Sequence, residues 1–341
     1  MKRRVILLSF ACILFLANSC STDFNVIAPY KETMVVYGLI NPKSTAQYVR
    51  ISKAFLGDGN SLIMAQQKDS INYADVLDVK IQRIKDGIAY TPFNLTRDVS
   101  VPKDSGIFNF PYNVLYKCSN PILADGSSYK LTVHNNQTGL TATSETNIIP
   151  DFVPVNVVEP MRFTSNILQS ISLNPAAKYG WVYNLIIRFH YKEVTVATHD
   201  TVSKYVDWNF EDQAVGAQVP TTVSYSNIYL PDLYRIIGSA VSPKDTNIIK
   251  RIIPANTVPG PTADSPIELI YTAGTEELYT FQQLTQPLNG LVQDRPSYTN
   301  IQNGLGLFTC RHIISQFHNL KDASRLAFDT SAYTRYIHFI H

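Results

Sequence analysis

Cysteine is scarce in this sequence of 341 residues, which has only four. Two of them, Cys12 and Cys20, lie within the first twenty residues, which leaves Cys118 and Cys310 for the folded body. An exported compartment would permit a disulfide bond, but these two cysteines fall in different predicted domains. We therefore expect two unpaired thiols that pack like small hydrophobic side chains, with a bridge between them as the alternative.

Charge is also sparse. Charged residues make up 16% of the chain and the formal net charge is +2. The sequence has no basic stripe and no long run of like charges, which excludes the electrostatic footprint of a nucleic-acid-binding protein. Tyr, Thr, Ser, Asn, Val and Ile are abundant instead, and this composition is typical of β-sheet proteins.

Sequence signatures of catalysis and metal binding are missing. There is no Gly-Xaa-Ser-Xaa-Gly elbow, no His-Glu-Xaa-Xaa-His motif and no Ser-Xaa-Xaa-Lys in a convincing setting. Glu276 and Glu277 are neighbours in a predicted helix, so their side chains point to different faces. His338 and His341 are three apart in a predicted strand and also face opposite ways. We therefore expect no catalytic residue, no metal site and no cofactor.

Long hydrophobic runs are absent from the chain after its N-terminal segment. No stretch there approaches the ~20 apolar residues of a transmembrane helix. Residues 1–19 have the pattern of a secretory signal peptide: a basic start followed by an apolar segment too short to span a bilayer. The segment ends in Leu16-Ala17-Asn18-Ser19-Cys20, which resembles the lipobox read by the lipoprotein signal peptidase. Ala17 stands where that pattern usually has Leu. The alternative is an ordinary secretory signal with an incidental cysteine.

Cleavage before Cys20 would expose a thiol and an amine for acylation. Each buried methylene of the acyl chains contributes about 0.8 kcal/mol, so several chains give firm anchoring. We therefore expect residues 20–31 to be a lipidated N-terminus and tether, with Cys20 as the lipidation site. The membrane is then a partner through this lipid.

Short extended segments separated by turn signals dominate the rest of the chain. Seven such segments between residues 32 and 150 suggest an immunoglobulin-like β-sandwich, and Asp86-Gly87 is a strong hairpin signal within it. Prolines at 150 and 154 mark the predicted boundary, because proline is excluded from central strands. Residues 151–341 form a second β-rich domain with one short helix near 275–284. The fold class is therefore all-β, with two immunoglobulin-like or β-sandwich domains.

The segment 297–310 (SYTNIQNGLGLFTC) has the glycines of a ligand loop. A phosphate-binding loop, however, opens a helix, and no helix signal follows Gly306. Leu305, Leu307 and Phe308 instead begin an apolar run. We therefore expect a glycine bend that enters a core strand.

Tyrosine, with 20 residues, is the type best suited to binding, since its ring offers contact area and a polar tip. Tyr225, Tyr229 and Tyr234 lie in a region from 212 to 250 that Pro and Gly punctuate. We expect long loops there, and long loops are often functional. These three residues are the candidate binding loop, and Trp181 and Trp208 are expected inside strands and in the core.

Several pieces of the chain resemble one known family. "YTNIQNGLGLF" (298–308), after the predicted helix, is similar to the C-terminal signature of a Bacteroidota outer-membrane lipoprotein family known as domain of unknown function 4249 (DUF 4249). Other similar pieces are "MVVYGLINP" (34–42), "DVLDVKIQRI" (75–84) and "ILADGSSYKLTVHNNQTGLTATSETNIIP" (122–150). The resemblance implies an outer-membrane lipoprotein with an immunoglobulin-like first domain, often encoded near TonB-dependent receptors, and no catalytic residues. The tail from Arg311 to His341 departs from the family pattern.

Three functional hypotheses follow. The first is a non-enzymatic accessory or binding lipoprotein of the outer membrane that works with a TonB-dependent receptor. The second is a structural or adhesion lipoprotein of the cell envelope. The third and weakest is a hydrolase on a β-sandwich scaffold. The side of the outer membrane that the body faces stays open, because only one acid, Asp23, closely follows the cysteine.

Overall fold

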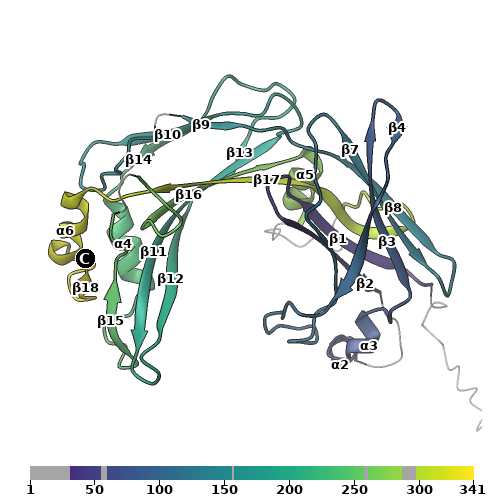
Figure 1. Ribbon diagram of the computed structural model, residues 1–341, viewed down its shortest axis with the longest axis horizontal. Helices are drawn as coiled ribbons and strands as arrows, with labels where there is room; N and C mark the ends of the chain where they lie inside the picture. Colours follow the sequence, from purple (N-terminus) through teal and green to yellow (C-terminus); the bar gives the residue numbers. More distant parts are fainter. Residues whose placement is uncertain (1–30, 55–59, 156, 257–259, 286–296) are drawn as a thin grey trace, which may run out of the picture.

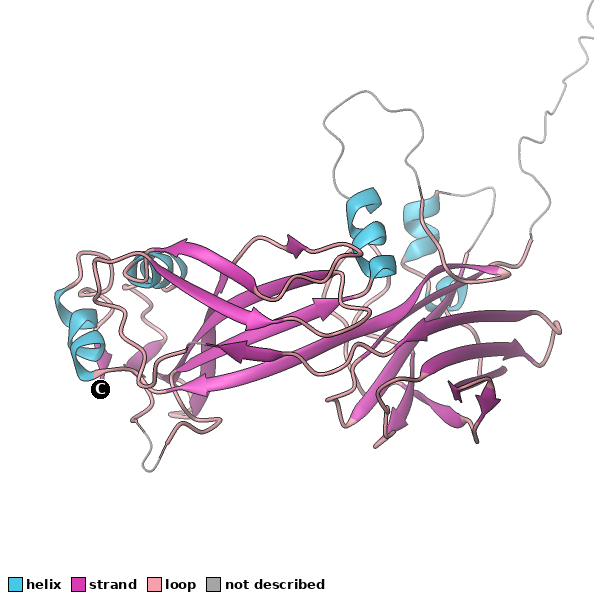
Figure 2. Ribbon diagram, turned by 90° about the horizontal axis from the view of Figure 1, so that it is seen from above, coloured by secondary structure: helices cyan, strands magenta, loops and turns pink. Residues whose placement is uncertain are grey.

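The computed structural model describes residues 31–54, 60–155, 157–256, 260–285 and 297–341. Strands make up most of its regular structure, and this confirms the predicted all-β class. The molecule is an arch of two arms that share the long strand β17 (Gly304–His318), as Figure 1 shows. Strands form both arms, and the helices lie at the ends and edges of the sheets (Figure 2).

Besides the shared strand β17, the first arm contains eight strands and two short helices in the described residues. One layer has the order β17-β1-β2-β6-β5, and the sheet then continues from β5 through β3, β7 and β8, which form the other layer. Buried side chains from both layers, including Val36, Val49, Val79 and Leu131, fill the space between them. The elements are β1 (Met34–Ile40), β2 (Ala46–Lys53), α2 (Ser61–Ala65), α3 (Lys68–Ile71), β3 (Leu77–Lys85), β4 (Ile88–Ala89), β5 (Phe93–Asp98), β6 (Leu115–Ser119), β7 (Ser128–Asn135) and β8 (Thr141–Asn147).

The second arm is built around β11, which pairs with β16 on one side and with β12 on the other. A separate three-stranded sheet has the order β14-β10-β9. The elements are β9 (Val153–Val155), β10 (Gln169–Asn174), β11 (Val182–Thr195), β12 (Thr201–Asn209), β13 (Gln213–Ala214), β14 (Val223–Ile228), α4 (Asp232–Ala240), β15 (Ile248–Ile252), β16 (Ile267–Gly274), α5 (Glu276–Thr285), α6 (Asp322–Thr330) and β18 (Phe339–Ile340).

Strand β17 joins the two arms. Its residues 304–310 pair in parallel with β1, and its residues 311–318 pair antiparallel with β16. The linker expected at 150–154 begins beside this strand, since His312 of β17 lies within hydrogen-bond distance of the Ile149 and Pro150 carbonyls. The division at residue 150 stays a prediction, but β17 contributes to the sheets on both sides of it.

The segment 297–310 is a bend followed by a core strand, as predicted. The Asn300 side chain holds the start of β17: its Nδ2 donates to the Phe308 carbonyl at 2.7 Å, and its Oδ1 accepts the Phe308 N–H at 2.9 Å. Gly306 has φ +112°, a conformation that favours glycine. A Cβ at this position would lie 2.0 Å from the Val36 carbonyl oxygen of β1. Glycine at 306 therefore allows β1 and β17 to approach each other.

The expected hairpin at Asp86-Gly87 is present between β3 and β4, with both residues at positive φ. The expected helix near 275–284 is α5, which begins after Gly274. Cys118 and Cys310 are both buried and free, which confirms the prediction of unpaired thiols.

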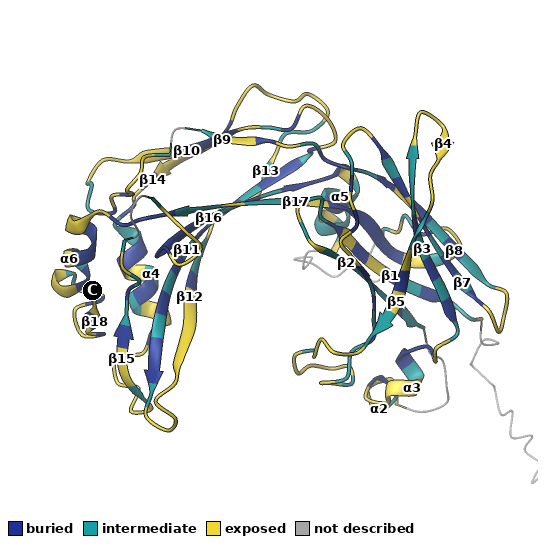
Figure 3. Cartoon of the chain, viewed as in Figure 1, coloured by how far each residue is buried: buried dark blue, intermediate teal, exposed yellow. Residues whose placement is uncertain are grey.

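Two helices of the second arm were not predicted. The region from 212 to 250 was expected to be long loops, but it contains β13, β14 and α4. Pro231 and Gly238 were interpreted as loop signals, whereas Leu233, Tyr234 and Ile237 form a buried helical face. Helix α6 lies in the C-terminal tail, where Phe328 stacks on Phe189 of β11 at 5.0 Å between ring centroids. These helices form because tertiary contacts bury their apolar faces (Figure 3).

Candidate functional site

A pocket of about 400 Å³ lies where the two arms meet, close to the start of α5. Its wall is assembled from four separate segments: the end of β8, the loop between β10 and β11, the loop between β13 and β14, and the first turn of α5. This volume is within the range of ~300–1,000 Å³ usual for small-ligand sites. The polar and aromatic side chains in its wall include Asn147, Lys178, Tyr179, Trp181, Glu276 and Glu277.

The loop that carries Tyr179 and Trp181 is held by backbone hydrogen bonds. The Trp181 N–H donates to the Gly274 carbonyl at 2.8 Å, and the Val215 N–H donates to the Trp181 carbonyl at 2.8 Å. The loop also wraps around the buried hydroxyl of Tyr183, which accepts the Ala176 N–H at 2.9 Å. Burial raises the pKa of Tyr183 to about 12, so the hydroxyl stays neutral. The two aromatic side chains of the pocket are therefore presented by a fixed backbone.

Glu276 and Glu277 occupy the first turn of α5. The hydroxyl of Thr275 accepts the Leu278 N–H at 3.4 Å and contacts the hydroxyl of Thr309 on β17. Acidic side chains are favoured at this position, because the N-terminus of a helix carries partial positive charge. Burial raises the pKa of Tyr298, and the negative charges of Glu277 and Glu276 raise it further. The Tyr298 hydroxyl therefore lies within the electrostatic field of the two glutamates.

Three charged side chains line the pocket without an ion pair. Neither Lys178 nor either glutamate forms a salt bridge with another residue in the part of the chain that the structure describes. Lys178 and Glu276 are exposed, and Glu277 is half-buried. A ligand with an amino group could reach the carboxylates, and an aromatic or sugar ring could stack on Trp181 or Tyr179.

The structure separates the three predicted binding tyrosines. Tyr225 lies in β14 and Tyr234 in α4, and each is only 4% exposed, so the prediction that they lie in a long binding loop is wrong. The Tyr234 hydroxyl donates to the Ser324 carbonyl of α6 at 2.9 Å, and burial raises its pKa. The rings of Tyr225 and Phe210 pack in a T-shaped arrangement. Both are core residues, because strand and helix replace the expected loop. Tyr229 is exposed, between β14 and α4, and lies outside the pocket.

Sequence patterns contain only weak signals for the pocket. Trp181 was expected inside a strand and in the core, but it lies just before β11 and is half-buried. The glutamate pair was set aside because neighbours in a helix diverge, yet both side chains line this pocket. Trp208 lies in β12 and is also half-buried, against the core. The sequence features that could have indicated this pocket were the two acids in the first turn of a predicted helix and the Tyr-Gly-Trp segment at 179–181.

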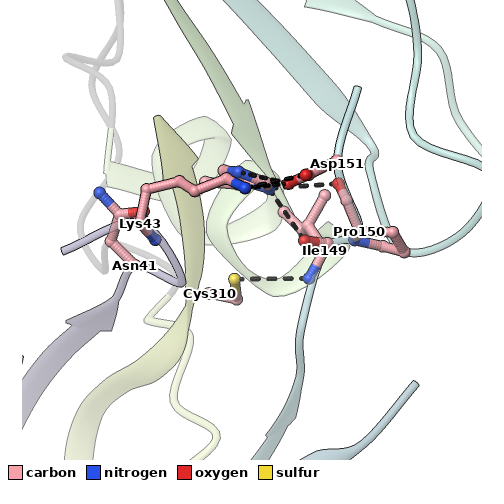
Figure 4. Close-up of polar contacts among 7 residues, drawn as sticks. Asn41, Lys43, Ile149, Pro150, Asp151 and Cys310 are labelled. Atoms are coloured by element: carbon pink, nitrogen blue, oxygen red, sulfur yellow. Dashed lines mark hydrogen bonds and ion pairs between the residues drawn. The ribbon is translucent and has the colours of Figure 1, made fainter. Parts of the chain in front are cut away.

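A second polar cluster lies at the crossing between the arms, where Figure 4 shows the linker residues Ile149 to Asp151 beside Cys310 and Lys43. His312 of β17 is fully buried, and its Nδ1 lies 2.9 Å from the Ile149 carbonyl oxygen and 3.1 Å from that of Pro150. Nδ1 therefore carries the proton and donates to these carbonyls. Burial lowers the pKa of His312, which keeps the ring neutral.

Asp151 is the carboxylate closest to this histidine. It lies 3.4 Å from His312 Nε2, but Nε2 makes no hydrogen bond among the described residues. The Lys43 ammonium contacts the same carboxylate at 2.8 Å, so we regard Asp151 as the partner of Lys43. The Ile149 N–H also points to the Cys310 sulfur at 3.5 Å, and burial raises the pKa of that thiol to about 12. This cluster ties the linker to β17.

Histidines elsewhere in the described residues pair with separate carboxylates. His318 contacts Glu159 at 2.9 Å, and His341 contacts Asp329 at 3.1 Å. No group of three or more His, Cys, Asp or Glu residues suited to a metal ion occurs within the described ranges. No helix in those ranges is both long enough and apolar enough to cross a membrane.

Comparison with known proteins identifies no family for this chain. No family model and no curated protein matches the chain. Among solved structures, trypsin-activated alpha-2-macroglobulin from Escherichia coli matches with 10% sequence identity and a TM-score of 0.17. The match covers 72% of this chain but only 14% of that protein. At this TM-score the similarity supports no argument about function.

Proposed function

We propose that this chain is a lipid-anchored protein of the cell envelope that binds a small ligand or a partner segment without transforming it. The observation that carries the proposal is the pocket between the arms. Two aromatic rings and Lys178 from one loop line this pocket together with Glu276 and Glu277, and these three charged side chains lack ion-pair partners among the described residues. Such a combination suits recognition of a ligand with an amino group and a flat face, such as an amino sugar or a short peptide.

The cellular setting in this proposal comes from the sequence. The lipobox-like segment before Cys20 supports a lipid anchor, and the resemblance to DUF 4249 supports the outer membrane and a TonB-dependent receptor as partner. In this arrangement the anchor holds the body near the receptor while the pocket binds cargo. A structural or adhesion role in the envelope is the competing function, and it needs neither the pocket nor the receptor.

A pull-down from native membranes in mild detergent tests both the lipid anchor and the receptor partnership. The tagged chain should enrich a TonB-dependent receptor, and the Cys20→Ala variant should be released from membranes and lose that enrichment. Mass spectrometry of the recovered proteins and of the N-terminal peptide gives the readout. If the Cys20→Ala variant stays membrane-bound, the lipid anchor is wrong. Binding to matrix polymer with no receptor would favour adhesion.

The pocket is tested by the double variant Glu276→Gln, Glu277→Gln. It should lower recovery of cargo by about fivefold or more, equivalent to roughly 1 kcal/mol of lost charge-assisted contact. Glu211→Gln is the matched control, since Glu211 is an exposed glutamate of the same arm outside the pocket. Equal recovery with both variants would contradict the assignment of the pocket.

A further inference from the structure

Large apolar side chains are exposed together at one end of the first arm. They come from helix α2 and from the loop between β5 and β6, and we name this group the apolar tip. The side chains with their exposed fractions are Leu62 59%, Ile63 62%, Ile107 63%, Phe108 46% and Phe110 46%. Clustered exposure of this kind marks a surface that contacts a protein or a membrane.

The two segments of the apolar tip are bonded to each other. The Asn109 N–H donates to the Ala65 carbonyl at 2.9 Å, and its side-chain amide donates to the Gln66 carbonyl at 2.8 Å. The Gln66 side chain donates in return to the Ile107 carbonyl. Asn60 caps α2 by accepting the Leu62 N–H at 2.8 Å. The exposed side chains therefore project from a cross-linked pair of segments.

The apolar tip lies at the end of the arm where the chain enters β1. Met34 pairs with Lys53, and the Ala54 N–H donates to the Thr33 carbonyl at 3.0 Å, so β2 ends beside the start of β1. The bridge between Ser52 and Asn72 places α3 at the same end. Figure 3 shows α2 and α3, with exposed surface on α2, at the end of the arm away from the crossing.

The loop between β5 and β6 emerges at this end as well. Asp98 pairs with Leu115, and Leu115 pairs with Arg50 near the end of β2. The opposite end of the arm holds Ile40, the linker and the crossing to the second arm. The entry of the N-terminal segment and the apolar tip thus share one end.

A short tether limits how far this end can lie from the membrane. Cys20 and Lys31 are separated by eleven steps of chain, which span roughly 40 Å at full extension. The occupant that this geometry favours is the bilayer that holds the acyl chains. This step rests on the lipid anchor of the proposed function.

We propose that the apolar tip inserts into the interfacial layer of that bilayer and sets the orientation of the arch on the membrane. Two lysine ammonium groups lie over aromatic rings beside this surface, and that of Lys103 is buried. Lys103 Nζ lies 5.1 Å from the Phe108 ring centroid, and Lys68 Nζ lies 5.3 Å from that of Tyr112.

Charge contributes little to membrane binding by the apolar tip. The two flanking lysines are matched in number by Asp69 and Asp104, which are both exposed. Burial of apolar area therefore drives binding, and neither anionic lipid nor low salt is required. This separates the proposed contact from electrostatic attachment, which salt would weaken.

Flotation with lipid vesicles tests the apolar tip apart from the anchor. The full mature chain with Cys20→Ser, which has no acyl chain, should float with phosphatidylcholine vesicles, and added phosphatidylglycerol should change the bound fraction little. Adding Ile63→Asp and Ile107→Asp should lower the partition coefficient at least about tenfold. Ile122→Asp is the matched control, because Ile122 is 81% exposed and follows β6 at the opposite end of the arm; it should change little.

The outcomes separate the two proposals. No flotation of the Cys20→Ser chain, or equal flotation of the Ile63→Asp, Ile107→Asp variant, would overturn the membrane contact. If that variant instead lost the receptor in the pull-down while vesicle binding did not change, the apolar tip would be a protein-docking surface, which also overturns it. Acylation is read independently from the mass of the Cys20 peptide of the wild-type chain. An unmodified Cys20 with a vesicle-binding tip would remove the anchor and leave the membrane contact standing.

Discussion

Gly306→Ala should lower the free energy of unfolding by more than about 4 kcal/mol, an effect of the size reserved for severe backbone or core damage. The expected loss has two causes. Gly306 has φ +112°, where an L side chain is strained, and a new Cβ would stand 2.0 Å from the Val36 carbonyl oxygen. Because this oxygen belongs to the backbone of β1, no rotation of a side chain can relieve the collision. Urea unfolding followed by circular dichroism measures the change.

Gly126→Ala separates the two causes. Gly126 also has positive φ, at +67°, but a Cβ added there would meet nothing within 4 Å. It should lose only about 1–2 kcal/mol, the cost of the left-handed conformation for an L residue. If the Gly306→Ala variant does not fold, its soluble yield beside that of Gly126→Ala still provides the comparison. Similar losses in the two variants would show that the contact between β1 and β17 is not tight at Gly306.

His312→Ala should destabilise the protein by about 2–4 kcal/mol, because it removes a buried ring and leaves buried carbonyls without their donor. The Ile149 and Pro150 carbonyls both depend on His312 Nδ1. His312→Asn should lose much less, since the amide nitrogen of Asn can take the place of Nδ1. The difference between the two variants, measured by urea unfolding at pH 8, reports the hydrogen bonds that hold the linker.

The same site should make stability depend on pH. Burial lowers the pKa of His312 in the folded protein below its ordinary value of 6.5. At a pH between the folded and the unfolded pKa, the unfolded chain therefore binds a proton that the folded chain does not. Stability from this group is therefore complete above about pH 6.5 and falls as the pH drops toward the folded pKa. The Asn side chain of His312→Asn cannot titrate. The difference in free energy of unfolding between wild type and this variant should therefore become smaller as the pH is lowered from 8 to 5.

His199→Asn is the control for this comparison. His199 is exposed in the turn between β11 and β12 and has φ +59°, a conformation that Asn tolerates. Its stability difference from wild type should stay constant across the same pH range. A constant difference for His312→Asn as well would contradict the assignment of a neutral, buried imidazole.

Local sequence patterns determined much of the first arm. Extended segments between turn signals indicated the strands between residues 32 and 150, and Asp86-Gly87 located the hairpin, because strand propensity and tolerance of positive φ are properties of the segment itself. The stretch after Asn303 was correctly interpreted as a core strand for the same reason. The all-β class and the two unpaired thiols also followed from composition and spacing.

The tertiary structure alone decided which distant segments meet. The parallel pairing of β1 with β17 joins opposite ends of the chain, and the pocket combines Asn147 with a loop near Trp181 and the start of α5. Sequence patterns carry no information on such pairs, because they form through packing and not through local propensity. Tyr225 and Tyr234 show the same limit: tyrosine suits a core as well as a surface, and only the packing of α4 and β14 buried them.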